Sequence, residues 1–371
     1  MRVVVVGAGI GGLSVAIGLR QAGHEVVVLE QAPRLEAAGA DLTLFANAMT
    51  ALDRLGVAKA IAGLGAAATH SAILTSAGEP LAELPSDLLE GAVAVHRADL
   101  QGVLAQAAQD AEIHLGVEMT AVEQDAEGVV ARAAGGREYR GDLLIGADGL
   151  NSAVRSAVAE GQPRYAGYTA WRGVSRVTID TGQLTESWGV GERFGLVDIG
   201  RSRTYWFATK NAPEGQPDEL GGRRAEILRR FGEWHEPIAA VADAADEEAI
   251  LRNDVYYLEP LRRWTEGRVV LLGDAAHATT PGVGQGAAQA IEDAVVLADQ
   301  LARGRDLASA LRDYESVRRP RVKRVLKLSR RADRAAQMAS PVGWRLRNAV
   351  VRRMSARAQR RQLGPLVRHR I

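Results

Sequence analysis

Residues 1–30 have the sequence MRVVVVGAGIGGLSVAIGLRQAGHEVVVLE, and the fold can be inferred outward from this stretch. The valines of 3–6 predict a strand buried on both faces, residues 13–19 predict a helix, and residues 25–29 predict a second strand. A strand, a glycine-rich turn, a helix and a strand in this order are typical of a Rossmann-like nucleotide-binding unit. We therefore expect an α/β fold built on a parallel sheet.

The turn between the first strand and the helix carries GxGxxG at Gly7, Gly9 and Gly12. We expect Gly7 to make the tight turn, Gly9 to let the backbone approach a pyrophosphate, and Gly12 to let the helix pack closely on the strand. The phosphates would lie against the free N–H groups of the helix N-terminus. Glu30 ends the second strand, where its carboxylate can accept hydrogen bonds from a ribose. This context favours a dinucleotide site over a glycine-rich turn without a ligand.

The composition limits the classes of protein and the kinds of site that the chain can form. The 371 residues, with 47% hydrophobic and 25% charged residues, suit two domains or one large α/β unit with an insertion. A net charge of +1 gives no indication of nucleic-acid binding. The absence of cysteine excludes disulfides, thiolate metal sites, a cysteine nucleophile and cysteinyl attachment of a cofactor.

Three further absences shape the expectations. The histidines are scattered without a pair at ligand spacing, so we expect no metal. No signal peptide precedes the first strand, and no apolar run has membrane-spanning length, so we expect a cytoplasmic protein.

The pattern changes along the chain. Between residues 164 and 253 it becomes a series of strands rich in aromatic and β-branched residues. We expect a discontinuous nucleotide-binding domain of residues 1–71, 92–163 and 254–340, a β-rich domain of residues 72–91 and 164–253, and a basic helical tail of residues 341–371. The chain contains one strand–GxGxxG–helix unit, so a second nucleotide would have to bind without a fold of its own.

Local periodicity predicts the other elements. These are helices over 47–55, 97–108 and 225–234, a long helix after residue 286, hairpins over 72–85 and 119–133, and buried strands over 142–145 and 268–272.

The C-terminal region from Arg318 to Ile371 is strongly basic, and Asp333 is its only acidic residue. The favoured interpretation is a solvated helical face packed against an acidic body. The alternative is weak contact with a membrane surface. No aromatic residues alternate with the arginines to stack on bases, which argues against nucleic acid.

Two further segments combine glycines with an acid. The first is GADG at 146–149, which follows a predicted strand and precedes a helix expected near Ser152. The second is GDAAHATTPGVGQG at 273–286, which precedes the long helix. An aspartate at a strand end can bind a sugar-like hydroxyl, glycine turns let the backbone approach a flat ring, and a helix N-terminus favours a developing anion. Each alone is more often a cap or a tight turn, but all three in this order are far more specific.

On these motifs the chain resembles the FAD-dependent aromatic hydroxylases, the class A flavoprotein monooxygenases with the para-hydroxybenzoate hydroxylase fold, in their salicylate-hydroxylase-like branch. The resemblance covers nearly the whole chain. It includes GAGIGG, HRADL around Arg97, GADGLNSAVR, YAGYTAWRGV at 165–174, GDAAHATTPGVGQGAAQAIEDA at 273–294 and YESVRRPR at 314–321. It implies a Rossmann-like FAD-binding domain interrupted by a β-rich substrate domain, with C-terminal helices, non-covalently bound FAD, NAD(P)H as a transient co-substrate and O₂.

The resemblance also implies residue roles. Glu30 would hold the adenosine ribose, and Arg97 would contact the pyrophosphate–ribityl region. Asp274 would bind the ribityl chain. The pair Asp148 and Gly149 would serve both FAD and the transient nicotinamide nucleotide. The loop from Pro281 through Gly284 and Gln285 to Gly286 would line the isoalloxazine, with backbone N–H groups near its N1–C2=O edge.

Two positions depart from the family pattern. Gly282 stands where the family commonly has an asparagine, so a side-chain contact would be lost while the backbone role is kept. In Gly39-Ala40-Asp41 an aspartate replaces a usually small residue. We expect Asp41 to be a solvated turn residue; if it faces the flavin instead, it would alter the choice of substrate.

Candidate substrate residues lie in the β-rich block. Arg193 and Tyr205 stand on successive predicted strands, a layout similar to the arginine–tyrosine pair of flavin urate hydroxylases. The alternative is that Arg193 is a sheet-surface cation and Tyr205 a core aromatic. Arg172 is a third candidate. His277 is expected to cap a strand–loop junction, and no residue is predicted to deprotonate a phenol.

The resemblance implies an NAD(P)H- and O₂-dependent hydroxylation of an aromatic or heteroaromatic small molecule through a flavin C4a-hydroperoxide. The alternatives are a flavin-dependent epoxidase, an FAD-dependent isoprenoid reductase, or a flavoprotein that acts only as a sensor. Either a monomer or a homodimer fits. The ring, its position of attack and the choice between NADH and NADPH stay open.

Overall fold

The computed structural model describes residues 1–35, 41–369 and 371. The opening residues fold as predicted, into β1 (Arg2–Val6), α1 (Ile10–Gln21) and β2 (Glu25–Glu30). β1 lies parallel to and between β2 and β12 (Leu143–Gly146). Its valines are almost fully buried because the sheet is covered on both faces.

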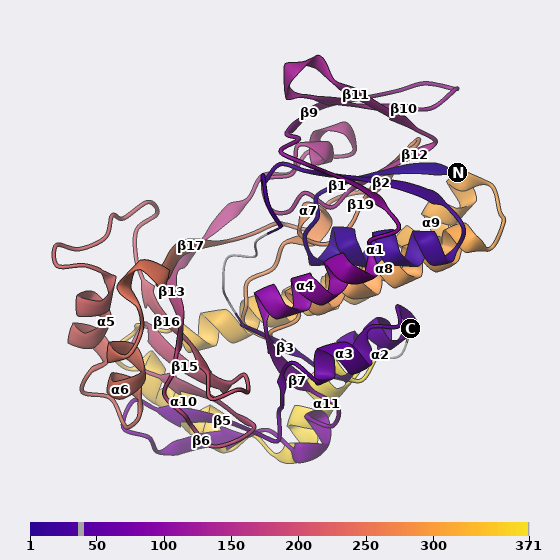
Figure 1. Ribbon diagram of the computed structural model, residues 1–371. Helices are drawn as coiled ribbons and strands as arrows, with labels where there is room; N and C mark the ends of the chain where they lie inside the picture. The colour runs from indigo at the N-terminus through magenta and orange to yellow at the C-terminus, as the bar shows by residue number, and fades with distance from the viewer. Residues whose placement is uncertain (36–40, 370) are drawn as a thin grey trace.

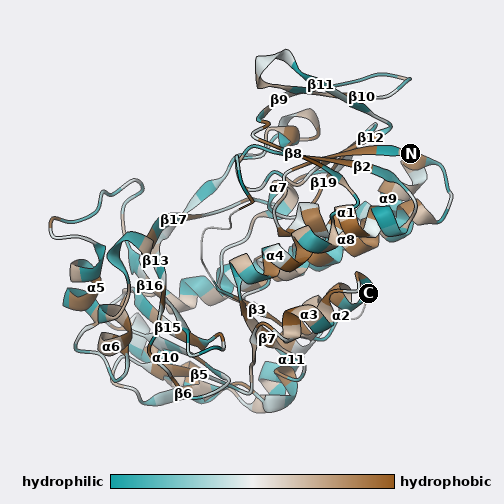
Figure 2. Cartoon of the chain, viewed as in Figure 1, coloured by the Kyte–Doolittle hydropathy of each residue, from teal (hydrophilic) through white to brown (hydrophobic). Residues whose placement is uncertain are grey.

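This sheet has six strands in the order β18 (Thr265–Glu266), β19 (Val269–Leu271), β12, β1, β2 and β8 (Glu112–Leu115). All neighbours are parallel except β18, which is antiparallel to β19. On one face lie α1, α4 (Arg97–Ala107) and α8 (Gly286–Ala302), and on the other lies a three-stranded sheet of β9 (Met119–Gln124), β10 (Val129–Ala133) and β11 (Glu138–Gly141) (Figure 1). The central strands are predominantly hydrophobic (Figure 2).

A second, seven-stranded sheet has the order β17 (Leu251–Tyr257), β13 (Arg164–Ser175), β16 (Thr204–Asn211), β15 (Glu192–Asp198), β14 (Gln183–Trp188), β5 (His70–Thr75) and β6 (Pro80–Glu83). Only β14 and β5 are parallel. One face packs its aromatic residues Trp171, Phe194 and Trp206 against α5 (Arg223–Phe231) and α6 (Ile238–Asp243). The other face carries the polar residues that matter below.

Two connections link the sheets. A small sheet of β3 (Asp41–Leu44), β7 (Val93–His96) and β4 (Ala66–Ala67) lies between them (Figure 1). Helices α2 (Ala46–Arg54) and α3 (Ala58–Ala62) connect β3 to β4. The 30-residue helix α9 (Leu307–Ala336) packs against α8 near its start and reaches the seven-stranded sheet near its end. The bounds of the two domains stay a prediction.

The predicted helices and hairpins are confirmed to within a few residues. One element is wrong: the helix expected near Ser152 is a 3₁₀ turn, η3 (Val154–Ala157). The tail forms α10 (Gly343–Arg352) and α11 (Ala356–Val367) and packs on the body, where Arg360 and Arg368 pair with Asp87. In the part of the chain that the structure describes, no helix has the length and apolar character required to cross a membrane.

Candidate functional site

The GxGxxG turn accepts only glycine at two positions and leaves space at the third. Gly7 has φ +102°, and a Cβ there would lie 2.4 Å from the Ala147 carbonyl oxygen. A Cβ on Gly12 would lie 1.8 Å from the Gly7 oxygen. By contrast, no atom lies within 4 Å of a Cβ built on Gly9, which precedes the first turn of α1 without a side-chain cap. An open position beside uncapped helix N–H groups suits a pyrophosphate.

The three glycine segments converge at one edge of the six-stranded sheet. Gly7 touches the strand end at Ala147, and a Cβ on Gly11 would meet Leu272 at 2.7 Å and Ala290 at 3.3 Å. Residues that directly follow β1, β12 and β19 therefore lie together, within a few ångströms of α1 and α8. The carboxyl ends of parallel strands are where such folds bind nucleotides.

Glu30 is held in place by the turn it would serve. Its Oε2 accepts a hydrogen bond from the Ala8 N–H at 2.7 Å, and its Oε1 accepts one from the Ala32 N–H at 2.9 Å. An ionised carboxylate has about four acceptor sites. Two therefore remain for ribose hydroxyls.

Arg97 and Asp274 are exposed residues that each begin a helix. Arg97 is the first residue of α4, and Asp274 begins α7 (Asp274–His277) directly after β19. Within residues 1–35, 41–369 and 371, neither side chain makes a hydrogen bond or an ion pair. A free cation and a free carboxylate are the groups that a pyrophosphate and a polyol chain require.

Asp148 is arranged differently, because local groups occupy its carboxylate. It accepts hydrogen bonds from the Ser152 hydroxyl at 2.6 Å and from the N–H groups of Ala153 at 2.8 Å and Val154 at 3.1 Å. Burial raises the pKa of Asp148, and these hydrogen bonds oppose that rise. The side chain thus caps η3 and shapes the turn at Gly149, which has φ +77° and open space beyond it. Direct contact of Asp148 with a cofactor stays a prediction.

The loop 281–286 ends in an unsatisfied amide. Gly284 (φ +61°) donates its N–H to the Pro281 oxygen at 2.8 Å, and Gln285 then caps α8. The Gln285 Oε1 accepts from the Asn47 Nδ2 at 2.9 Å, but the buried Gln285 Nε2 and Asn47 Oδ1 have no partner in residues 1–35, 41–369 and 371. Leaving a buried donor or acceptor unpaired costs about 1–3 kcal/mol. A ring edge that offers both C=O and N–H, as a flavin pyrimidine does, would satisfy this pair, so these residues fit FAD.

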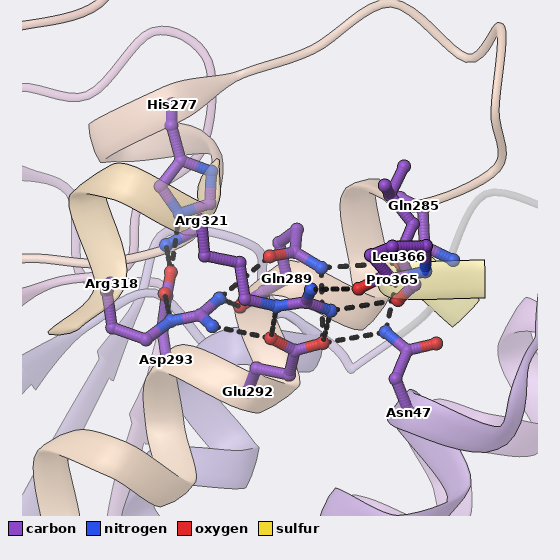
Figure 3. Close-up of polar contacts among 11 residues, drawn as sticks. Asn47, His277, Gln285, Gln289, Glu292, Asp293, Arg318, Arg321, Pro365 and Leu366 are labelled. Carbon is purple, nitrogen blue, oxygen red and sulfur yellow. Dashed lines mark hydrogen bonds and ion pairs between the residues drawn. The ribbon is translucent and has the colours of Figure 1, made fainter. Parts of the chain in front are cut away.

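Behind this loop lies a buried ionic network between α8 and α9 (Figure 3). Arg318 donates to Asp293 at 2.6 Å and to Glu292 at 2.5 Å, and Arg321 also donates to Glu292 at 2.5 Å. Burial alone would raise the pKa values of both carboxylates, but the paired cations hold them below their usual range. The network therefore stays ionised and fixes the start of α8. The YESVRRPR motif contained Arg318 and Arg321, but the sequence offered no sign of this role.

His277 does not cap the strand–loop junction as expected. Asp293 caps it, since its Oδ2 accepts the Gly273 N–H at 2.9 Å. The His277 Nε2 lies 2.5 Å from the same oxygen, so the histidine is a buried partner of Asp293.

The candidate substrate residues share one face of the seven-stranded sheet, because residues opposite each other in an antiparallel pair point the same way. Arg193 lies opposite Thr209, whereas Tyr205 lies opposite Val197, four residues along. The structure therefore brings Arg193 and Tyr205 to the same face without bringing them together.

Arg193 is 3% exposed, so the interpretation as a surface cation is wrong. Its guanidinium contacts Asp333 at 3.1 Å, Glu186 at 3.2 Å and Thr209 at 3.3 Å. Each nitrogen of the guanidinium therefore donates a hydrogen bond to one of these partners. A direct substrate contact by Arg193 stays a prediction.

Tyr205 has other polar neighbours. Burial raises the pKa of this phenol, with Arg172, Asp41 and Arg97 as its charged neighbours. The expectation that Asp41 is a solvated turn residue is wrong: it begins β3, and its buried Oδ1 has no partner within the described part of the chain. Gly39 and Ala40, the two preceding positions of that motif, lie outside the described residues.

Gly282 is explained by packing. A Cβ there would lie 2.7 Å from the Ser329 oxygen and 2.8 Å from the Asp333 carboxyl, so α9 leaves no room for the asparagine that the family commonly carries. The Gly282 N–H instead donates to Asp333 Oδ2 at 3.3 Å. Asp333 therefore connects the loop to Arg193.

Comparisons with known proteins agree with this geometry. The family model described as "FAD binding domain" matches residues 1–329. The chain is 42% identical to the aurachin C monooxygenase/isomerase of Stigmatella aurantiaca over 96% of this chain and 95% of that protein. It is 36% identical to an FAD-dependent urate hydroxylase of Klebsiella pneumoniae over 90% of each. The structure superposes on that of Klebsiella pneumoniae HpxO complexed with FAD and uric acid with a TM-score of 0.91 and 31% identity, covering 98% of this chain and 96% of the other.

Proposed function

The chain belongs to the FAD-binding domain family, and from this membership we propose that it is an FAD-dependent monooxygenase that hydroxylates an aromatic or heteroaromatic small molecule. We further propose NAD(P)H as the reductant. The observation that carries the proposal is the convergence of the three glycine segments beside an uncapped α1 N-terminus, with relatives named for monooxygenation and hydroxylation across almost the full chain.

Each part of FAD has a group suited to hold it. The N–H groups at the start of α1 would bind the pyrophosphate, and Glu30 would bind the adenosine ribose. Arg97 and Asp274 would bind the pyrophosphate–ribityl region and the ribityl chain. The loop that ends at Gln285 would hold the ring, whose pyrimidine edge complements the unpaired Gln285 amide.

When bound, FAD accepts a hydride from NAD(P)H and activates O₂ for transfer of one oxygen atom to the substrate. The protein supplies binding, orientation and electrostatics. The N-terminus of α8 favours negative charge next to the loop 281–286. The Phe207 ring packs against Gly195, where a Cβ would come within 2.0 Å of it, and offers an apolar surface beside Arg172 that would exclude water.

The names of the relatives favour hydroxylation over the epoxidase and isoprenoid reductase alternatives. The experiment that tests the proposal is oxidation of NADPH and NADH by the purified yellow protein, with and without aromatic candidates, under air and under argon. We expect substrate-stimulated oxidation that requires O₂ and a product that contains one atom from labelled O₂. Turnover without O₂ would contradict a monooxygenase, and a colourless protein that does not take up FAD would contradict the cofactor.

A matched pair of variants tests the pyrophosphate position. Gly9→Ala adds a methyl group in open space next to α1, and Gly102→Ala adds one in open space on the exposed side of α4. Both should fold, because neither methyl group meets a protein atom. We expect only Gly9→Ala to weaken FAD binding, measured as the concentration of FAD that restores the yellow holoprotein.

A further inference from the structure

One buried carboxyl oxygen lies near the face of the seven-stranded sheet that carries Arg172 and Tyr205, and it has no hydrogen-bond partner among the described residues. Among the residues that the structure describes, the buried Asp41 Oδ1 accepts no hydrogen bond, although the amide groups of Leu42 and Val95 lie close to the carboxyl. Burial raises its pKa well above the usual range. Native proteins leave few buried polar atoms unsatisfied, and each one requires a reason. A ligand that supplies the missing donor is such a reason.

Strand pairing fixes the direction in which Asp41 points. β3 pairs antiparallel with β7, so Asp41 lies opposite His96, and the next residue is Arg97, the first residue of α4. Ala94 of β7 packs in one cluster with Tyr205 of β16. Asp41 therefore lies where the small sheet meets the face of the seven-stranded sheet that carries Tyr205. It is close enough to Tyr205 for its charge to raise the pKa of that phenol.

Arg172 faces the same space from the opposite side. It stands two residues before Val174, which is directly opposite Tyr205, so the Arg172 and Tyr205 side chains share one face of the sheet. Arg172 is half-buried, and among the residues that the structure describes it forms no hydrogen bond or ion pair. Its charge also influences Tyr205. A half-buried guanidinium and a buried carboxyl oxygen thus approach one tyrosine, both without partners.

This space adjoins the loop expected to line the ring of FAD. β3 continues through Phe45 into α2, and a Cβ on Gly284 would lie 3.8 Å from the Phe45 ring. Helix α8, which follows the loop, also contacts β3. The strand that begins with Asp41 therefore ends against the loop 281–286.

We propose that Asp41 and Arg172 form the polar end of the substrate pocket, where the Asp41 Oδ1 accepts a hydrogen bond from a ring N–H or O–H and Arg172 donates to a ring carbonyl or oxyanion. The inference rests on the proposed function and specifies its substrate class. That class is a ring that carries both a hydrogen-bond donor and an oxygen acceptor, as lactams, quinolones, purines and hydroxypyridines do. An Oδ1 accepts whether or not the other oxygen of the carboxyl carries a proton, so the geometry serves both protonation states.

The test compares two probes that differ in a single donor, 4-quinolone and N-methyl-4-quinolone. Each is titrated into the FAD-loaded protein, and binding is followed by calorimetry and by the change in flavin absorbance. We expect the wild type to bind 4-quinolone at least about tenfold more tightly, because a site built to accept a hydrogen bond rejects an analogue that lacks the donor.

Two substitutions at Asp41 test whether its acceptor oxygen causes the preference between the two probes. Asp41→Leu has similar size and no acceptor, so the preference for 4-quinolone should disappear. Asp41→Asn keeps an acceptor oxygen, so part of the preference should return. Arg172→Met should weaken both probes by a similar factor. Asp53→Leu, which removes an exposed carboxylate on α2, is the control and should change neither affinity.

The outcomes that overturn the inference are distinct from failure of the proposed function. A preference unchanged in Asp41→Leu, equal binding of the two probes to the wild type, or binding of neither probe would each refute the assigned contact. Loss of FAD affinity in Asp41→Leu would assign Asp41 to the cofactor instead. A protein that never binds FAD would instead contradict the proposed function.

Discussion

Two groups of charged residues lie at opposite ends of one face of the seven-stranded sheet, and they differ in whether the charges are paired. At one end, Arg193 is surrounded by Asp333, Glu186 and Thr209, and every arm of its guanidinium is occupied. At the other, Arg172 and Asp41 approach Tyr205 without partners of their own among the described residues. A paired charge supports the structure, whereas an unpaired buried one is available to a ligand. The difference assigns support to the first end and recognition to the second.

The paired end also reaches the loop expected at the ring of FAD. Asp333 of α9 bonds Arg193 with one oxygen and the Gly282 N–H with the other. Arg193 therefore acts on the loop through Asp333, as a positioning residue.

The largest loss of stability is expected when Arg193 is removed from its ion pairs with Asp333 and Glu186. Arg193→Ala leaves Asp333 and Glu186 without their cation, and removing one partner of a buried pair costs about 3–5 kcal/mol. Arg172→Ala, which breaks no pair, should cost less than about 1 kcal/mol. Urea unfolding of the two variants measures both, and equal losses would contradict the comparison.

The link from the paired end to the loop gives the second prediction. Gly282→Asn forces a side chain against Ser329 and Asp333, and such overpacking costs about 1–3 kcal/mol. FAD affinity should fall as well, because the loop must move. Gly102→Asn is the control, since no atom lies within 4 Å of a Cβ at this exposed position of α4. Thermal unfolding and FAD titration of both variants check this, and a Gly282→Asn variant as stable as the wild type would contradict it.

The third prediction concerns pH at the unpaired end. Folding raises the pKa of Asp41 above its unfolded value of about 3.9, so the folded state binds this proton more tightly. The stability that the protonated carboxyl contributes is complete below that unfolded value and is lost as pH rises through the folded pKa. Asp41→Asn cannot ionise, so its free energy of unfolding should rise relative to that of the wild type as pH rises from about 5 to about 8.

Urea unfolding across that pH range measures the difference. The neighbouring groups His96, Arg97, Arg172 and Tyr205 are present in both proteins and so cancel in the comparison. Asp53→Asn should show no such trend. A difference in unfolding free energy between Asp41→Asn and wild type that is constant with pH would mean that ionisation of Asp41 does not reduce stability.

The smallest effect is expected at Tyr205. Its hydroxyl makes no hydrogen bond to the residues that the structure describes, so Tyr205→Phe should change stability by less than about 0.5 kcal/mol. Tyr314→Phe is the matched comparison, because the buried Tyr314 hydroxyl donates to the Leu271 oxygen at 3.1 Å and its loss should cost about 1 kcal/mol. Equal losses in the two variants would indicate that Tyr205 is bonded after all.

Prediction from the sequence succeeded where the cause is local. The helices and hairpins followed from periodicity, and the GxGxxG roles followed from steric rules that the Gly7 and Gly12 contacts confirm. It failed at Ser152, where the carboxylate of Asp148 caps a 3₁₀ turn rather than an α-helix. It also failed at Asp41, which was expected in a solvated turn after Gly39-Ala40, whereas pairing with β7 placed the residue in a strand.

The amino-acid sequence alone specified the nucleotide-binding half and its dinucleotide site, because strand periodicity and the absence of a Cβ act within a few residues; that the dinucleotide is FAD followed from the resemblance to a family. Which charges are occupied became visible only in the folded chain. Arg193 and Asp333 are 140 residues apart, and Arg318 meets Asp293 from the next helix, so no local pattern distinguishes them from Arg172. Whether a buried charge supports the fold or awaits a ligand depends on partners that folding alone brings within hydrogen-bond distance.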